Sequence, residues 1–316
     1  MAGGELPEVK HTRGGGLSKE VKEQIDAWIA DLSELKPHGR REAAQGLRLL
    51  TRKSSLNRDY IADKGGIPSL ITVILETEDQ EIRKHAVTTL LNLSINAHLK
   101  DSIVNAGGID PIVEVLKSGD MEARENAAAA LFSLSMKTTN KSLIGSSDAM
   151  PGLVKLLIEG SKQGKKDAAS AIFDLAICHE NKALAVRSGV IPPLIQLLTD
   201  EKQGMADEAL VTLAILATHM EGQEAIGQTG TAIPILVDII SDGVPRNKEN
   251  ATAILLELCS NDVNHVYTST KLGVCGPLGE LSSTGSAKAR RKAKKLLDLH
   301  RHAQHLLGST CGSRSI

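Results

Sequence analysis

The sequence predicts an all-α protein built from stacked helical repeats, and two columns of residues with one shared period predict it. The first column opens each segment resembling Ile-Pro-x-Leu-Ile, in steps of 41 or 42 residues: Ile25, Ile67, Ile109, Met150, Ile191, Ile233 and Cys275. The second column holds an alanine in steps of 41 to 43 residues: Ala43, Ala86, Ala127, Ala168, Ala209, Ala251 and Ala293. Two independent columns that keep one period indicate an array of repeated units.

Each unit carries the pattern of three helices. Residues 67–75 place apolar residues at the i, i+3, i+4, i+7 spacing of an amphipathic helix. A second amphipathic run spans about Glu81 to Ser94, and a third, shorter helix is expected between units. Three helices in about 42 residues are typical of armadillo repeats rather than two-helix HEAT repeats.

The short helix has its own predicted ends. Asparagine stands ten residues before the opening residue of three units, where it could cap this helix: Asn57, Asn140 and Asn181. Glycines that can adopt a positive φ are expected to end it, at Gly65-Gly66, Gly107-Gly108 and Gly189. The alanine column is expected where helices cross closely, because only a small side chain fits there.

The array is predicted to be a right-handed superhelical armadillo solenoid. It would comprise about six full three-helix repeats after an N-terminal two-helix cap that Trp28 closes. The array would span residues 18–307, with disordered tails at 1–17 and 308–316. The last long helix, 286–307, has a basic outer face, and we expect His300, His302 and His305 to belong to that solvated face rather than to a metal site.

Composition excludes several classes of function. The net charge is −1, so no global field attracts nucleic acid or anionic lipid, and aromatic residues for base stacking make up 2% of the chain. Four scattered cysteines suggest neither a disulfide framework nor a zinc site. No apolar run reaches the roughly 18 residues of a membrane span, and residues 1–17 do not resemble a signal peptide. We therefore expect a cytoplasmic or nuclear protein.

No catalytic, cofactor or metal site is predicted. The segment 160–166 is the nearest approach to a phosphate loop, but its glycine spacing is one residue short and no Ser or Thr follows the lysine. Nothing in the sequence resembles an activated nucleophile with its base. We expect a protein partner, and no nucleic acid, membrane or small-molecule substrate.

A binding groove is predicted along the last helix of each unit. Positions two before, two after and six after the column alanine share one face of that helix. The polar members of these rows are the candidate site: Lys84, Thr88, Asn92, Glu125, Ser133, Lys166, Ser170, Asp174, Asp207, Glu249 and Glu257.

Three other interpretations of this face can be compared. Armadillo carriers of nuclear-localisation signals use a ladder of Trp and Asn, but here the Trp positions hold residues such as Thr88 and Ser170, and Asn survives only at Asn92. A uniformly basic groove is absent, because the first row alternates in sign. The face could also be merely solvated, with Lys84 pairing with Glu125 and Lys166 with Asp207.

Several stretches resemble the armadillo region of plant U-box ubiquitin ligases, over roughly residues 20–305: 121–135, 164–189, 204–228, 245–260 and the closing helix 287–299. In that family the U-box docks a ubiquitin-conjugating enzyme and the repeats select the target. The resemblance thus implies a target-recognition module in protein ubiquitination. Because 17 residues precede the repeats, too few for a U-box, the chain could be a truncated ligase or a stand-alone scaffold or adaptor in signalling.

Overall fold

The computed structural model describes residues 16–33, 37–200, 202 and 204–311, and within these residues every regular element except one isolated bridge residue is a helix. The chain divides into two compact units, the first ending at Leu175 and the second beginning at Ala176. Two helices open unit 1, and sets of three helices follow in both units. This confirms the predicted all-α repeat and its two-helix cap.

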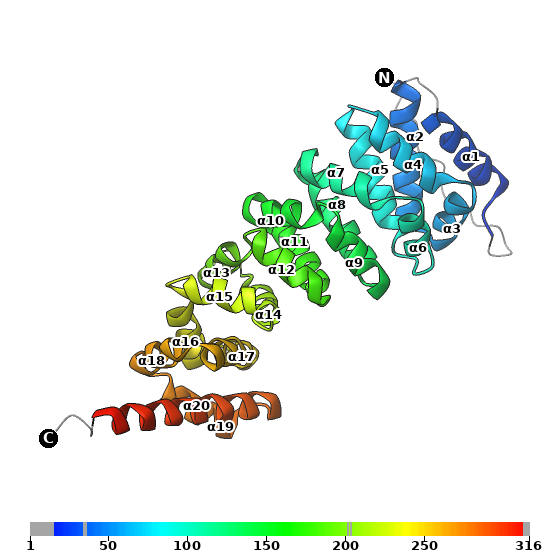
Figure 1. Cartoon of the computed structure of the whole chain (residues 1–316). Coiled ribbons are helices and arrows are strands. Elements are labelled where there is room, and N and C mark those ends of the chain that lie inside the picture. Colours follow the sequence, from blue (N-terminus) through cyan, green and yellow to red (C-terminus); the bar gives the residue numbers. More distant parts are fainter. Residues whose placement is uncertain (1–15, 34–36, 201, 203, 312–316) are drawn as a thin grey trace. The chain divides into compact units, whose positions relative to one another are not determined.

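Unit 1 starts with the cap, α1 (Lys19–Ser33) and α2 (Pro37–Lys53). Three sets follow: α3 (Ser55–Asp63), α4 (Gly66–Glu76) and α5 (Gln80–Leu93); α6 (Leu99–Asn105), α7 (Ile109–Ser118) and α8 (Met121–Ser135); α9 (Thr138–Ser146), α10 (Ala149–Glu159) and α11 (Lys162–Leu175). The long helices α2, α5, α8 and α11 pack each against the next (Figure 1).

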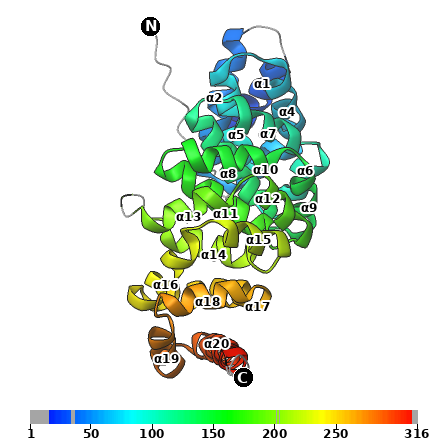
Figure 2. The same cartoon turned by 60° about the vertical axis from the view of Figure 1, so that its left-hand side comes forward.

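Unit 2 holds three further sets: α12 (His179–Arg187), α13 (Ile191–Thr199) and α14 (Ala206–Leu216); α15 (Met220–Gln228), α16 (Ala232–Asp242) and α17 (Pro245–Asn261); α18 (Val263–Lys271), α19 (Cys275–Thr284) and α20 (Ala287–Cys311). Figure 2 shows α19 beside α20, with which it packs, and α17 also packs against α20. Helix α20 extends past the predicted array end at residue 307, and residues 1–15 and 312–316 of the two predicted tails lie outside the described residues.

The alanine column lies inside the core. All seven alanines, from Ala43 to Ala293, are fully buried. Trp28 is also buried, and its ring lies so close to α2 that a Cβ atom on Gly46 would come within 2.4 Å of it. The cap is therefore closed by Trp28, as the sequence predicts.

In several sets the turn between the first two helices contains a left-handed glycine. Gly65, Gly107 and Gly189 have φ values of 82°, 80° and 81°, a left-handed conformation that costs other residues free energy. The predicted glycine ends are confirmed.

The predicted asparagine caps are wrong. Asn57, Asn140 and Asn181 are the third residues of their helices, and the caps of α3, α9 and α12 are other residues. Asn57 and Asn140 are instead buried, and their Nδ2 atoms donate to the Leu50 and Leu134 carbonyls at the end of the preceding long helix, at 2.8 and 3.1 Å. The last carbonyls of a helix have no hydrogen-bond partner within that helix. Because these carbonyls are buried, they need a donor from elsewhere, and the asparagine side chains supply it.

One histidine also differs from expectation. His300 is 2% exposed, and its two ring nitrogens lie 3.0 Å from Ser269 Oγ and 2.8 Å from the Leu296 carbonyl. It belongs to the contact between α18 and α20 rather than to a solvated basic face. A residue near the boundary between a core stripe and a polar stripe cannot be assigned from helical periodicity alone.

Candidate protein-binding surface

The predicted site residues lie on the third helix of each set. In unit 1 these are Lys84, Thr88 and Asn92 on α5, Glu125 and Ser133 on α8, and Lys166, Ser170 and Asp174 on α11. Positions two residues before or after a column alanine lie about 160–200° from it around the helix. Because the alanines are buried, the solvent-accessible side opposite them is one surface of α2, α5, α8 and α11, which we call the third-helix face of unit 1.

The third-helix face of unit 1 is concave. Arg48 Nη1 on α2 lies 3.8 Å from Glu122 Oε1 on α8, although α5 lies between these two helices. Side chains of next-but-one helices can meet above the intervening helix only where the surface curves inward. The ion pair therefore crosses α5 on the hollow side.

Lys84 sits beneath a group of carboxylates. Its Nζ lies 2.7 Å from Glu81 Oε1, 3.4 Å from Asp120 Oδ2 and 3.6 Å from Glu122 Oε2. The side chain of Lys84 is 13% exposed, whereas those of the three carboxylates are 42–58% exposed. The hydrogen bond that Lys84 donates to Glu81 is the main cause that raises the pKa of Lys84.

This arrangement replaces the predicted ion pair between Lys84 and Glu125. The carboxylate of Glu125 instead accepts a hydrogen bond from Ser161 Oγ on the next repeat. The first row alternates in sign in the sequence, and its Lys166 on α11 is exposed. On α5 and α8, however, the structure places the cation Lys84 beneath carboxylates that are more exposed. The solvent-facing part of α5 and α8 is therefore acidic at their N-terminal ends.

The row six residues after the alanines is engaged within the protein. Asn92 Nδ2 donates to the Arg48 carbonyl at 3.3 Å and to Thr51 Oγ1 at 3.1 Å on the preceding repeat. Asp174 accepts hydrogen bonds from Lys141 Nζ and, at 2.7 Å, from Ser135 Oγ. Ser133 Oγ accepts from Lys100 Nζ at 2.7 Å. These side chains therefore join neighbouring repeats.

Sequence reasoning missed the lysines that make these links. Lys100 Nζ donates to the carbonyls of Ser94 at 2.6 Å and Ser133 at 2.7 Å, and burial lowers its pKa. Lys141 Nζ donates to the Ser135 carbonyl at 2.7 Å and pairs with Asp174. Both lysines satisfy carbonyls near a helix C-terminus, where the helix dipole favours a cation. Their spacing of 41 residues was the available signal.

Thr88 and Ser170 form the middle row of the same face. Thr88 Oγ1 donates to the Lys84 carbonyl at 2.7 Å and accepts from Asn126 Nδ2 at 2.9 Å. Ser170 is half-buried on α11. Small side chains in this row keep the floor of the concave face low.

An apolar row on this face was also missed. The chain contains two phenylalanines, and both occupy the fifth position after a column alanine, Phe132 on α8 and Phe173 on α11. Both are partly exposed, as is Leu91 at the same position on α5. One turn further, Ile95 and Met136 are 60% and 63% exposed. Aromatic and Met side chains of this kind are enriched where proteins bind one another.

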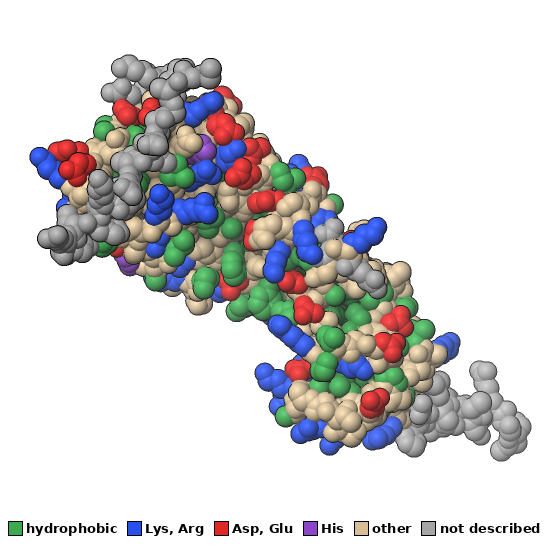
Figure 3. Space-filling model, turned by 180° about the vertical axis from the view of Figure 1, so that it is seen from behind, with side chains coloured by type: hydrophobic (Ala, Val, Ile, Leu, Met, Phe, Trp, Pro, Cys, Tyr) green, Lys and Arg blue, Asp and Glu red, His purple; other side chains and the backbone are tan. Residues whose placement is uncertain are grey.

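Charges of both signs also lie on the face of unit 1 that Figure 3 shows. Figure 3 shows Asp and Glu side chains interspersed with Lys and Arg on the face of unit 1 seen there, with hydrophobic side chains between them. An electrostatic potential of one sign could attract nucleic acid or lipid without shape complementarity. The face of unit 1 seen in Figure 3 therefore carries charges of both signs rather than one.

Comparison with known proteins decides the family. The sequence profile described as "Plant U-box protein ARM repeat region" matches residues 24–311. The chain belongs to this family. It is 61% identical over 262 residues to U-box domain-containing protein 13 of Arabidopsis thaliana, covering 83% of this chain and 39% of that protein. U-box domain-containing protein 14 of the same plant is 55% identical over 303 residues, covering 93% and 47%. The chain thus spans less than half of these two relatives.

Solved structures show the armadillo fold. A designed armadillo repeat protein matches with a TM-score of 0.64 at 23% identity, covering 74% of this chain and 99% of that one. A second designed armadillo repeat protein, solved in complex with the peptide (KR)4, matches with a TM-score of 0.63 at 22% identity, covering 74% and 99%. The plant U-box ARM region described here is therefore an armadillo array, as the sequence predicts.

Unit 2 of this ARM region carries the remaining candidate residues on its own third helices. Asp207 on α14 accepts from Asn247 Nδ2 at 2.8 Å. Glu249 on α17 accepts from Ser286 Oγ at 2.6 Å, and this hydrogen bond is the main cause that lowers the pKa of Glu249. Glu257 is half-buried. The first two carboxylates are thus engaged between repeats, as in unit 1.

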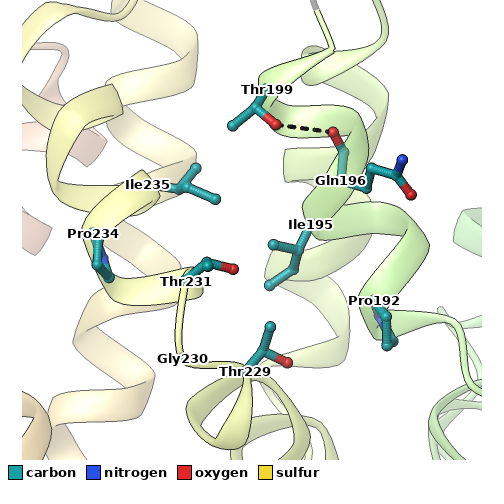
Figure 4. A pocket seen from close by; sticks show the side chains of 9 residues that line it. All are labelled: Pro192, Ile195, Gln196, Thr199, Thr229, Gly230, Thr231, Pro234 and Ile235. Carbon is teal, nitrogen blue, oxygen red and sulfur yellow. Dashed lines mark hydrogen bonds between the residues drawn. The ribbon is translucent and has the colours of Figure 1, made fainter.

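Unit 2 also has a cleft away from its third helices, between α13 and α16, with a volume of about 640 Å³. Figure 4 shows Ile195 of α13 and Ile235 of α16 reaching into the gap from opposite sides. Gly152 occupies the position of Ile235 in α10, and a Cβ there would meet Leu116 of α7 at 2.8 Å. The larger Ile235 thus holds α13 and α16 apart. No charged side chain lines this cleft, whose lining combines apolar residues with the neutral polar side chains of Gln196, Thr199, Thr229 and Thr231.

Metal-ligand groups, membrane-spanning helices and the segment resembling a phosphate loop can be compared with the described part of the chain. Residues 16–33, 37–200, 202 and 204–311 contain no group of three His, Cys, Asp or Glu side chains placed to hold a metal ion. No helix within those ranges has the length and apolar character needed to span a membrane. Segment 160–166, the nearest approach to a phosphate loop, is the turn into α11 and its first residues.

Proposed function

We propose that this ARM region recognises a segment of a target protein on the third-helix face of unit 1, and that it supplies target selection within a U-box ubiquitin ligase. The observation that supports this most is the partly exposed apolar row on a concave surface, because exposed aromatic and Met side chains are costly to leave in water without a partner. The family and the names of the relatives support the ligase context.

The repeats suit this role mechanically. Lys100 and Lys141 join neighbouring repeats through buried hydrogen bonds, so the helices that carry the face hold a fixed spacing. A preorganised surface loses little conformational entropy when a partner binds.

A random dodecapeptide library displayed on phage tests the recognition surface. We expect the chain to enrich peptides whose binding is lost in the double variant Phe132→Ser, Phe173→Ser. The variant Leu75→Ser is the matched control, because Leu75 is 60% exposed on α4, outside the third-helix face. Peptides that bind both variants equally would refute the assignment of the surface.

The ligase context needs a separate measurement. A U-box protein that contains this ARM region, supplied with ubiquitin and its activating and conjugating enzymes, should modify a carrier protein fused to an enriched peptide. The double phenylalanine variant should modify that carrier no faster than an unfused carrier. Equal modification by both proteins would contradict the proposal that these repeats select the target.

A further inference from the structure

The third-helix face of unit 1 has two rows of different chemistry. At the N-terminal ends of α5 and α8 the exposed groups are carboxylates, those of Glu81, Asp120 and Glu122. Apolar side chains lie at the C-terminal ends of α5, α8 and α11, and Phe132 and Phe173 among them are partly exposed. The two rows run in the same direction, across the helices.

The carboxylate row carries an excess of negative charge. With Glu125 it contains four carboxylates, and Lys84 and Arg48 form ion pairs with it. His85 Nε2 also lies 3.9 Å from Glu81 Oε2, but burial lowers the pKa of His85 and so disfavours its charged form. The side chains of Lys84 and Arg48 are 13% and 27% exposed, so they neutralise the row from below. The part that faces solvent is therefore complementary to a cation.

The distance between the rows matches an extended chain. Seven residues separate Glu125 from Phe132 along α8, which corresponds to about 10 Å at 1.5 Å per residue. Successive side chains of an extended segment point to opposite sides. A segment lying across the helices between the rows would therefore direct alternate side chains to the carboxylates and to the apolar row.

We infer that unit 1 binds an extended protein segment in which basic and apolar residues alternate. This inference rests on the proposed function and specifies its partner. A uniformly basic segment would leave the phenylalanines uncovered, and an acidic segment would meet the exposed carboxylates. An amphipathic helix would present its charged and apolar groups with a period of 3.6 residues. Two parallel rows, one on each side of the bound segment, instead match side chains that alternate with a period of two residues.

A defined peptide tests the alternation. The probe is a fluorescein-labelled peptide of sequence Gly-Lys-Leu-Lys-Leu-Lys-Leu-Gly, and its control has the same composition in blocks, Gly-Lys-Lys-Lys-Leu-Leu-Leu-Gly. Fluorescence anisotropy should give a dissociation constant at least about tenfold lower for the alternating peptide, because only that peptide satisfies both rows. Equal affinity for the two peptides would overturn the inference.

Variants locate the binding on each row. Phe132→Ser should weaken the alternating peptide about tenfold or more, and Glu122→Lys should weaken it and reduce its salt dependence. Asp110→Lys on α7 is the charge control, because Asp110 is exposed outside the third-helix face. Thermal unfolding of each variant verifies that it is folded. Equal affinity in Glu122→Lys and Asp110→Lys would contradict the carboxylate row.

The library selection separates the two proposals. Enriched peptides that depend on Phe132 but show no alternation of basic and apolar residues would refute this inference and leave the proposed function standing. Failure to enrich any peptide that depends on Phe132 would refute the proposed function itself.

Discussion

Replacing Gly46 by alanine should destabilise the cap of unit 1. A Cβ atom at this position would lie 2.4–2.6 Å from three carbons of the Trp28 ring. Trp28 is 5% exposed, so the ring has little free space into which it can move. The variant Gly39→Ala is the matched control, since it lies in the same helix and its Cβ would meet nothing within 4 Å.

The two substitutions should change the free energy of unfolding in opposite directions. Overpacking of a buried site costs about 1–3 kcal/mol, and the higher helix propensity of alanine returns about 1 kcal/mol. Gly46→Ala should therefore destabilise by up to about 2 kcal/mol. Gly39→Ala should stabilise by about 0.5–1 kcal/mol, because it gains the helix propensity without the clash.

Circular dichroism during urea unfolding measures this difference, and hydrogen exchange locates it. Because terminal repeats can unfold separately from an array, the amides of α1 and α2 should exchange faster in Gly46→Ala while those of α8 are unchanged. A Gly46→Ala protein as stable as Gly39→Ala would refute the close packing of Trp28 against α2.

Three further predictions concern buried polar groups. Lys141→Met should destabilise unit 1 by about 3–5 kcal/mol in urea unfolding, because it leaves the carboxylate of Asp174 unpaired in a mostly buried site; an unchanged midpoint would contradict the link. Burial, followed by the charge of Arg48, lowers the pKa of His85, so below about pH 6.5 the unfolded chain binds a proton that the folded chain does not. Stability should then fall with falling pH until the folded-state pKa is reached, and His85→Gln should lose this part of the dependence; an identical pH profile in the variant would count against it. Burial raises the pKa of Cys259 to about 12, so iodoacetamide at pH 8 should alkylate Cys259 only after unfolding, as mass spectrometry of native and urea-treated protein would show; rapid labelling of the native protein would contradict its burial.

The fold could be predicted because its signals repeat. The buried alanine in every third helix follows from one local steric requirement, and a positive-φ glycine such as Gly65 follows from another. Because each requirement recurs in several repeats, its residues recur at a regular spacing and can be recognised. The cap role assigned to Asn57 was wrong because a capping asparagine and a buried asparagine three residues into a helix look alike in sequence. Only the packing of the preceding helix distinguishes them.

The candidate site was harder to predict, because its side chains bond to the next repeat. Lys84 alternates in sign with Glu125 in the sequence, but it reaches Glu81, Asp120 and Glu122 instead. Which of two opposite charges remains exposed depends on the length of each side chain and on how deeply its Cα atom is buried. The amino-acid sequence does not show this burial directly. Phe132 could have been found earlier, since it and the only other phenylalanine share one position in the repeat.

Site-specific photocrosslinking tests the central claim most directly. Benzoylphenylalanine placed at position 132 should crosslink to the fluorescein-labelled alternating peptide, and the same group placed at position 75 on α4 should not. Crosslinking from position 75 alone, with none from position 132, would contradict recognition on the third-helix face of unit 1.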